Sequence, residues 1–209
     1  MGFFRSVMAA LVLLAALTTA AKFCDGRVCY SEFLSPEQIA FRIAIPDTAA
    51  QATSFDVLLQ IVAPKTVGWA GIAWAGRMVN NPLTIAYSDG GSGVTVSSRW
   101  ASSKSSPSPY SGASYETLPM STTNATHWRL DAICTGCSSW HGGELDPASS
   151  TAAIGWAMAY AAPTQPANNT SSIRYHSSRD RISFDLAAAK IANFNEAVNS
   201  LRGSGAGTV

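Results

Sequence analysis

A succession of short apolar stretches, separated by clusters of Gly, Pro, Ser and Asn, constrains the fold most strongly. The stretches alternate apolar with polar residues or are rich in β-branched and aromatic residues, as strands are. They cover residues 39–45, 55–62, 68–75, 83–87, 94–100, 127–133 and 153–160. Turn-forming clusters occur at residues 89–93, 102–109, 141–143 and 163–172. Many short strands with this spacing predict an all-β antiparallel sandwich.

One short helix is predicted near the C-terminus. Asp185 is a suitable N-cap and Gly203 a suitable end. The residues that recur at helical spacing between them are Leu186, Lys190 (by its stem), Phe194, Val198 and Leu201. No strand–helix alternation and no GxGxxG motif occurs, so a nucleotide-binding parallel sheet is not expected.

The N-terminus has the pattern of a secretory signal peptide. Arg5 precedes the apolar run 7–17, and small residues follow at 18–21. That run is shorter than the roughly 20 residues that span a bilayer, and no later segment is long enough. We therefore expect a signal peptide at 1–20, one domain at 21–201, a flexible tail or linker stub at 202–209, and a secreted protein without a membrane anchor.

The charge balance limits the possible partners. The 209 residues contain 14 Lys and Arg against 13 Asp and Glu, and Arg5 lies in the predicted signal. A nucleic-acid binder would need a basic face, so no nucleic-acid partner is expected.

Four cysteines lie in two close pairs, Cys24/Cys29 and Cys134/Cys137. Four cysteines allow three pairings, and the sequence alone does not choose among them. We favour a disulfide within each close pair, because each partner lies within a turn's reach of the other and an oxidising compartment favours disulfides. A redox dithiol or a zinc site is less favoured, and a c-type haem anchor would need His where Ser138 stands.

Three sequons predict glycosylation at Asn124, Asn168 and Asn169, each in a polar stretch. Hydrolytic chemistry is not favoured. No GxSxG elbow is present, and the carboxylates Glu144 and Asp146 lie in a turn.

Methionine and histidine supply the candidate metal ligands. Met78 follows the stretch 68–75 and its glycine turn, where a thioether has no evident packing role. Taken alone, such a Met most often fills a gap, and a lone His such as His176 is most often a surface or core group.

Other Met and His residues are weaker candidates. Met120 lies in a loop after Pro119 and is a rival ligand. Met158 alternates within a predicted strand and is expected in the core. His127 and His141 are expected to be structural or surface groups.

The order of several segments resembles the cytochrome domain of fungal cellobiose dehydrogenases. The matching segments are 68–78, Ser97 to Trp100, Asn124 to Trp128, Cys134 to Trp140, Gly155 to Ala157, and the His176 segment followed by Phe184-Asp185. The resemblance covers residues 29–198. No single segment is specific to that family, but their order and spacing together are.

The resemblance implies an immunoglobulin-like β-sandwich that binds haem b, of the DOMON iron-reductase type. Met78 and His176 match the two axial ligands of the haem iron, and Cys134 and Cys137 match a family disulfide. The family's tyrosine near the propionates falls at Lys104, with Tyr110 further on. Trp74, Leu83, Ile85 and Met158 are candidates for the apolar wall, and Lys104 or Arg99 for propionate contacts.

The implied function is electron transfer without a complete catalytic site in this chain. Met with His would close both axial positions, which favours outer-sphere transfer. The implied donor is a flavin-dependent sugar dehydrogenase, and the implied acceptor is a copper polysaccharide monooxygenase or another one-electron acceptor. The alternatives are a haem-free carbohydrate-binding sandwich, with an exposed aromatic strip, and a ferric reductase domain.

Overall fold

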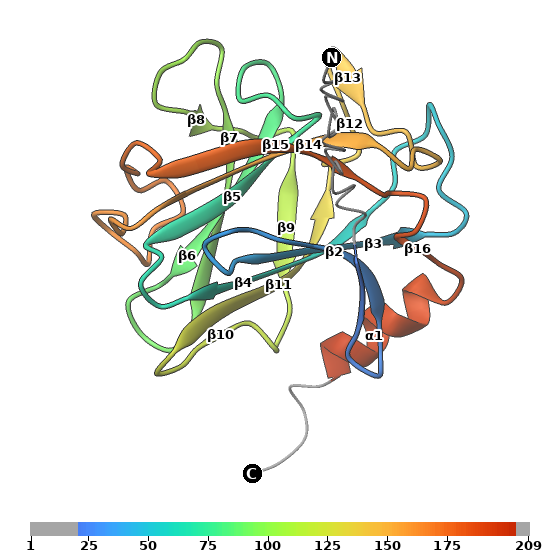
Figure 1. Ribbon diagram of the computed structural model, residues 1–209, viewed down its shortest axis with the longest axis horizontal. Coiled ribbons are helices and arrows are strands. Elements are labelled where there is room, and N and C mark those ends of the chain that lie inside the picture. The colour runs from blue at the N-terminus through green and yellow to red at the C-terminus, as the bar shows by residue number, and fades with distance from the viewer. Residues whose placement is uncertain (1–20, 204–209) are drawn as a thin grey trace, which may run out of the picture.

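A computed structural model describes residues 21–203, in which two β-sheets pack face to face (Figure 1). The first sheet has the order β1 (Ala21–Cys24), β2 (Cys29–Leu34), β3 (Ala40–Pro46), β4 (Val57–Pro64), β11 (His127–Thr135) and β10 (Thr122–Thr123). In addition, β9 (Ser114–Thr117) pairs with β11, and β16 (Lys190–Ile191) pairs with β3. The predicted antiparallel sandwich is confirmed.

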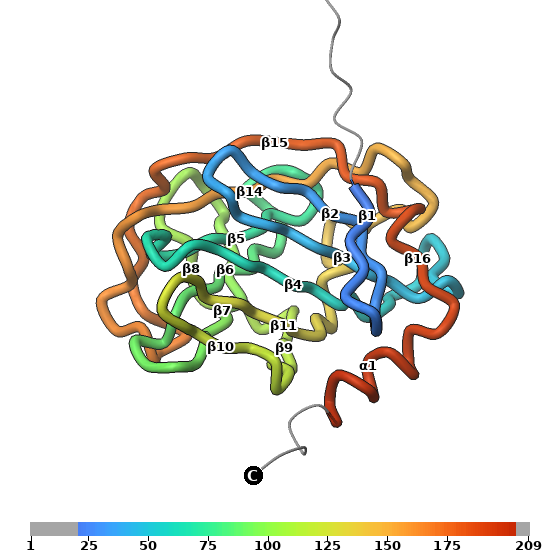
Figure 2. The backbone as a smooth tube through the Cα atoms, turned by 60° about the horizontal axis from the view of Figure 1, so that its bottom comes forward, coloured from blue at the N-terminus to red at the C-terminus, as the bar shows by residue number. Residues whose placement is uncertain are grey.

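The second sheet has the order β15 (Ser178–Phe184), β14 (Ala152–Ala159), β5 (Trp69–Trp74), β6 (Pro82–Ser88), β7 (Val94–Trp100) and β8 (Ser108–Pro109). A separate small hairpin joins β12 (Ser139–Trp140) to β13 (Gly143–Glu144). The single helix, α1 (Phe194–Gly203), lies against the first sheet, close to the β1–β2 hairpin (Figure 2).

All seven predicted strands are present, as β3, β4, β5, β6, β7, β11 and β14, with ends shifted by at most two residues. Two long strands were not predicted. In β15 the residues Arg179, Asp180 and Arg181 interrupt the apolar pattern because β15 is an edge strand with exposed side chains. In β2, which lies between β1 and β3, the buried Ser31 and the partly buried Glu32 interrupt it.

The core lies between the sheets and is built from alternate residues of each strand. Ala70, Ile72 and Trp74 face it from β5, and Leu59 and Ile61 face it from β4. The intervening residues of both sheets therefore point to two outer faces. This alternation decides which side chains are available to a ligand.

The predicted helix is correct only in its second half. Phe194, Val198 and Leu201 are buried on one side of α1, as predicted. Residues 186–191 are not helical. Asp185 Oδ1 accepts a hydrogen bond from the Ala188 N–H at 2.8 Å, which caps a turn, and Lys190 pairs with Ile45 of β3. Strand pairing takes the backbone groups that a helix would have used.

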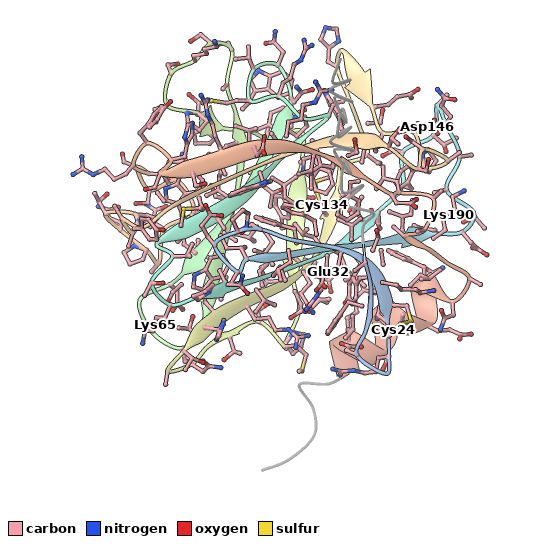
Figure 3. All side chains as sticks on the ribbon, viewed as in Figure 1. Cys24, Glu32, Lys65, Cys134, Asp146 and Lys190 are labelled. Carbon is pink, nitrogen blue, oxygen red and sulfur yellow. A yellow bond between two sulfur atoms is a disulfide. The ribbon has the colours of Figure 1, made fainter. Side chains whose placement is uncertain are left out.

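Both cysteine pairs form disulfides, Cys24–Cys29 and Cys134–Cys137. Figure 3 shows Cys134 in the interior of the sandwich and Cys24 in the N-terminal hairpin. The first disulfide joins the facing ends of β1 and β2. The pairing within each close pair is therefore confirmed.

The predicted signal peptide at 1–20 lies outside the described residues, as does most of the predicted tail. Arg202 and Gly203 belong to α1, so the folded part includes them. Between residues 21 and 203, no helix is long and apolar enough to cross a membrane.

Candidate functional site

Four small residues form the centre of the outer face of the second sheet. Gly71 and Ala73 alternate with the core residues of β5, and Gly155 and Ala157 alternate with those of β14. Gly71 lies opposite Ala157, and Ala73 lies opposite Gly155. We call these four residues the floor. No side chain larger than a methyl rises from it, and the Ile85 side chain and the Gly76 backbone lie close to Gly71 and Gly155.

A tight turn after β5 folds the Met78 loop onto one end of the floor. Ala75 and Gly76 have φ values of 63° and 76°, in the left-handed region that sharp turns use. A Cβ placed on Gly155 would lie 3.3 Å from the Gly76 carbonyl carbon, so this backbone covers Gly155 closely. Met78, two residues further on, is partly buried. This end of the site is therefore set by backbone contacts.

The His176 segment lies at the other end. The Trp69 indole N–H donates to the Arg174 carbonyl at 3.1 Å, and the Ser177 N–H donates to the Met158 carbonyl at 2.7 Å. Ile173 packs on the outer-face cluster that includes Trp69. These contacts hold His176, which is partly buried, where β15 begins.

The strand register places the two segments at opposite ends of the floor. The row Ala70–Met158–Ser178 lies at the His176 end, and the row Trp74–Ile154 lies at the Met78 end. These rows are separated by four residues along β5, about 13 Å at roughly 3.3 Å per residue. Two residues that are distant in sequence thus flank a single floor.

Arg99 fixes the loop that leads to His176. Its guanidinium donates to the Asn169 carbonyl at 2.9 Å and to the Ser171 carbonyl at 2.7 Å. It is 3% exposed. Tyr87 assists by donating to the Asn168 carbonyl at 2.7 Å. The Arg99 guanidinium therefore donates its hydrogen bonds to backbone carbonyls, and the suggestion that it contacts a propionate is not supported.

Two arginines of β15 line the side of the floor. By register, Arg179 lies opposite Ala157 and Arg181 opposite Gly155. The Arg181 Nε lies 2.8 Å from the position that a Cβ on Gly76 would take, so Arg181 reaches the Met78 loop. Burial lowers the pKa of His176, and the positive charge of Arg179 lowers it further. A lowered pKa keeps the imidazole neutral, which is the form that binds a metal.

Of the four residues predicted for the apolar wall, two lie on the outer face with the floor and two do not. Leu83 and Ile85 alternate with the inward-facing Thr84 and lie on the outer face, with Ile85 in the cluster around Trp69. Trp74 and Met158 are both 0% exposed in the core between the sheets. They face away from the floor, because their positions have the opposite alternation.

The rival ligands lie elsewhere. Met120 is in the turn between β9 and β10, and His127 begins β11, all in the first sheet. His141 is exposed in the β12–β13 turn. Met158 is a core residue, as predicted. Only the segments that carry Met78 and His176 come to the floor among the described Met and His candidates.

The remaining candidate residues are exposed or structural. Lys104, Glu144 and Asp146 are exposed, and Tyr110 stacks on Trp100 with ring centroids 5.0 Å apart. The predicted glycosylation residues Asn124, Asn168 and Asn169 are exposed.

The tryptophans do not form a sugar platform. Five of them are below 9% exposed, and the sixth, Trp100, is the one stacked on Tyr110. The exposed aromatic strip that a carbohydrate-binding module would present is therefore not formed by Trp within residues 21–203.

Sequence reasoning missed the floor and the β15 arginines. Gly71, Ala73, Gly155 and Ala157 fall inside apolar stretches, where small residues give no separate signal. The alternation within 152–159 could have indicated a face made only of Ala and Gly. The arginines were missed because β15 itself was not predicted.

Comparison with known proteins places this geometry in a family. Residues 23–196 match the model of the cytochrome domain of cellobiose dehydrogenase. A pyrroloquinoline quinone-dependent pyranose dehydrogenase of Coprinopsis cinerea is 35% identical over 129 residues, which are 61% of this chain and 18% of that enzyme. This chain thus covers less than a fifth of that relative.

Solved structures of cytochrome domains share this fold. The cytochrome b domain of the Coprinopsis cinerea pyranose dehydrogenase superposes with a TM-score of 0.79 at 27% identity, over 88% of this chain and 96% of that one. The cytochrome domain of Myriococcum thermophilum cellobiose dehydrogenase shares the fold, with a TM-score of 0.72 at 22% identity over the same shares. The family match spans both sheets and the Met78 and His176 segments, and the chain belongs to the cytochrome domains of cellobiose dehydrogenase.

Proposed function

We propose that this chain binds haem b beside the floor, where Met78 and His176 would hold it, and that it transfers single electrons. The observation that carries the proposal is the floor itself, a surface of Gly and Ala with the two candidate ligands at its opposite ends. Bound haem b would supply reversible one-electron Fe(III)/Fe(II) chemistry.

The donor set fits this cofactor. A thioether and a neutral imidazole are a known axial pair, and the thioether raises the reduction potential. In residues 21–203, no three His, Cys, Asp or Glu side chains come together as a metal site would require. The floor is apolar, which suits a porphyrin face, and the adjacent arginines supply charge for its carboxylates.

The chain's own residues would keep the ligands fixed. The Gly76 turn holds the Met78 loop, and the Trp69 and Arg99 hydrogen bonds hold the His176 segment. Both supports rest on strands of the same sheet. A rigid support of this kind lowers the structural change that accompanies each electron transfer.

The family also suggests the partners. The matched relatives are domains of sugar dehydrogenases, so a flavin- or quinone-dependent dehydrogenase is the proposed donor. A copper polysaccharide monooxygenase or another one-electron acceptor is the proposed recipient. We further propose secretion, with cleavage after residue 20, and glycans at Asn124, Asn168 or Asn169.

Absorption spectra test the haem site. The purified protein, supplied with haemin and reduced with dithionite, should show sharp low-spin α and β bands. Met78→Ala and His176→Ala should each lose them, while the matched controls Met120→Ala and His127→Ala should keep them. A protein that stays colourless after haem is supplied would overturn the proposal and favour a haem-free binding module.

Stopped-flow kinetics test the direction of transfer. The reduced protein should be reoxidised rapidly by a copper polysaccharide monooxygenase. A ferric chelate in its place distinguishes the ferric reductase alternative. Faster oxidation by the chelate than by the copper protein would count against the proposed acceptor.

A further inference from the structure

Four arginines around the floor lack the acidic partners that Arg27, Arg42, Arg129 and Arg202 have. Arg77, Arg174, Arg179 and Arg181 are exposed and lie on the segments that flank the floor. None of them forms an ion pair within residues 21–203. The ion pairs of that region instead involve Arg27, Arg42, Arg129 and Arg202.

The acidic residue nearest in sequence does not neutralise them. Asp180 lies between Arg179 and Arg181 on β15, so its side chain points to the opposite side of the strand. Its Oδ1 accepts a hydrogen bond from the Arg181 backbone N–H at 2.7 Å. Four guanidinium groups exceed the two carboxylates of a haem, so this face stays positive with haem bound.

Exposed aromatic side chains lie at the His176 end of the same face. Tyr175 is 78% exposed, and its ring centroid lies 4.0 Å from that of His176. Tyr160 is 61% exposed, and its N–H contacts Ser177. Apart from Leu34, these are the large hydrophobic residues that are exposed in residues 21–203.

We propose that these residues form a docking surface for an acidic face of a protein redox partner. We call this surface the arginine–tyrosine rim; it consists of Arg77, Arg174, Arg179, Arg181, Tyr160 and Tyr175. The inference rests on the proposed haem site. Tyr and Arg are enriched where protein interfaces derive most of their binding energy.

Charge complementarity explains why the partner should be acidic. Opposite charge steers a partner toward the exposed edge of the site and raises the association rate by about tenfold to a thousandfold at low salt. The ion pairs of Arg42, Arg129 and Arg202 reduce the positive field on the side of the first sheet. An acidic partner would therefore be oriented as well as attracted.

Small redox ions test the field of the rim. Oxidation of the reduced holoprotein by anionic ferricyanide should slow as salt rises from 10 to 300 mM, as counter-ions screen the rim. Oxidation by a cationic cobalt(III) complex should accelerate. The double variant Arg174→Gln/Arg179→Gln should lose most of both salt dependences and react with ferricyanide about tenfold more slowly at low salt.

A matched control separates the rim from net charge. Lys22→Gln/Arg202→Gln removes the same charge from the side of the first sheet, where Arg202 is on α1. It should leave both salt dependences close to wild type. Equal effects of the two double variants, or no salt dependence in the wild type, would overturn the proposal.

A binding measurement does not need haem. A fluorescent polyglutamate peptide should bind the apoprotein at 10 mM salt, and its fluorescence anisotropy should fall with Arg174→Gln/Arg179→Gln and with Tyr175→Ala. If these variants bind the peptide as well as wild type does, the proposed docking surface is wrong. If the protein binds the peptide through the rim but takes up no haem, only the proposed function is wrong.

Discussion

Charged residues are paired on one outer face of this sandwich and unpaired on the other. On the first sheet, Arg42 donates to Glu32 and Gln60, Gln60 donates to Asp131, and Arg129 also pairs with Asp131. On the second sheet, the floor is bare of polar side chains and its flanking arginines have no acidic partner. Charges that are paired in a network fix the fold, whereas unpaired charges beside an apolar floor remain available to a ligand.

The two outer faces also differ in how far other parts of the chain cover them. The β1–β2 hairpin extends over the first face, where the Phe23 ring covers Arg42 at 3.3 Å from the ring centroid. Helix α1 packs on the same sheet beside Tyr30 and Leu58. On the second sheet, the loop held by Arg99 covers β6 and β7 and stops short of the floor. The first face is therefore closed by the protein itself.

The largest expected effect comes from removing the centre of the network. Asp131 is 0% exposed, and its carboxylate accepts from Gln60 Nε2 at 2.6 Å and from Arg129 Nε at 2.5 Å. Asp131→Ala leaves the Gln60 amide without this acceptor and Arg129 with only Asp25, at 3.9 Å, and should lower the free energy of unfolding by about 3–5 kcal/mol. Urea denaturation measures it.

The same variant compares the two faces. Protein with Asp131→Ala that remains folded should still give the wild-type haem spectrum. Asp131→Asn keeps one acceptor oxygen and should cost less. Loss of the α and β bands in folded Asp131→Ala would show that the two faces are not independent.

A substitution on the floor should lower haem affinity and leave the stability of the fold nearly unchanged. Ala157 is partly exposed on the outer face of β14, so Ala157→Leu adds bulk over the floor and little to the core. Overpacking costs about 1–3 kcal/mol, so haem affinity should fall by about tenfold to a hundredfold. Haem titration monitored by absorption measures it, and apoprotein unfolding should change little.

The matched control for that variant is on the first sheet. Val62→Leu adds bulk to the outer face of β4, where Val62 lies opposite Arg129. Haem affinity should stay at the wild-type value. An equal loss of affinity in both variants would place the haem elsewhere.

The sequence was informative where alternation was regular and uninformative where tertiary contacts decide. Strands such as 94–100 were predicted to the residue, because apolar alternation reports a half-buried strand directly. Residues 186–191 were predicted as helix, yet residues 186–189 form a turn and Lys190 and Ile191 pair with the end of β3. Pairing with a strand that is distant in sequence thus outweighed the local helix propensity.

The site was predictable only through resemblance to a family. A lone Met78 and a lone His176 have no signal of their own, and only the register of β5, β14 and β15 brings their segments to one floor. The contribution of Gly155 also depends on its pairing with Ala73 across strands. Such information is in the fold rather than in any local spacing.

The core between the two faces offers a smaller test. The Trp74 indole N–H donates to Thr84 Oγ1 at 2.9 Å, Thr84 Oγ1 lies 2.5 Å from the Tyr115 hydroxyl, and that hydroxyl lies 3.4 Å from Cys137 Sγ. Burial raises the pKa of Tyr115, so the hydroxyl stays protonated and can donate. This chain of hydrogen bonds links the two sheets.

Thr84→Val should break that chain at constant size and cost about 1–3 kcal/mol, because buried donors lose their acceptor. Thermal unfolding measures it. Thr84→Ser restores the hydroxyl and should recover most of the loss. A Thr84→Val variant as stable as wild type would show that these hydrogen bonds do not stabilise the fold.

The smallest effect is expected at the exposed edge of the first sheet, where Arg202 of α1 donates to Glu116 at 2.7 and 2.6 Å. These hydrogen bonds lower the pKa of Glu116 below its ordinary value of 4.5. The unfolded chain therefore binds the proton more strongly, so the stabilisation is complete above pH 4.5 and is lost as the pH falls below it.

Both side chains are 47% exposed, which limits the contribution to about 0.2–1 kcal/mol. Urea unfolding of Glu116→Gln should differ from wild type by that amount at pH 7, and the difference should shrink at pH 3.5 or in 1 M NaCl. No difference at pH 7 would mean that this exposed ion pair does not stabilise the fold and that α1 is held by its buried face alone. A difference that persists under both conditions would assign the effect to something other than charge.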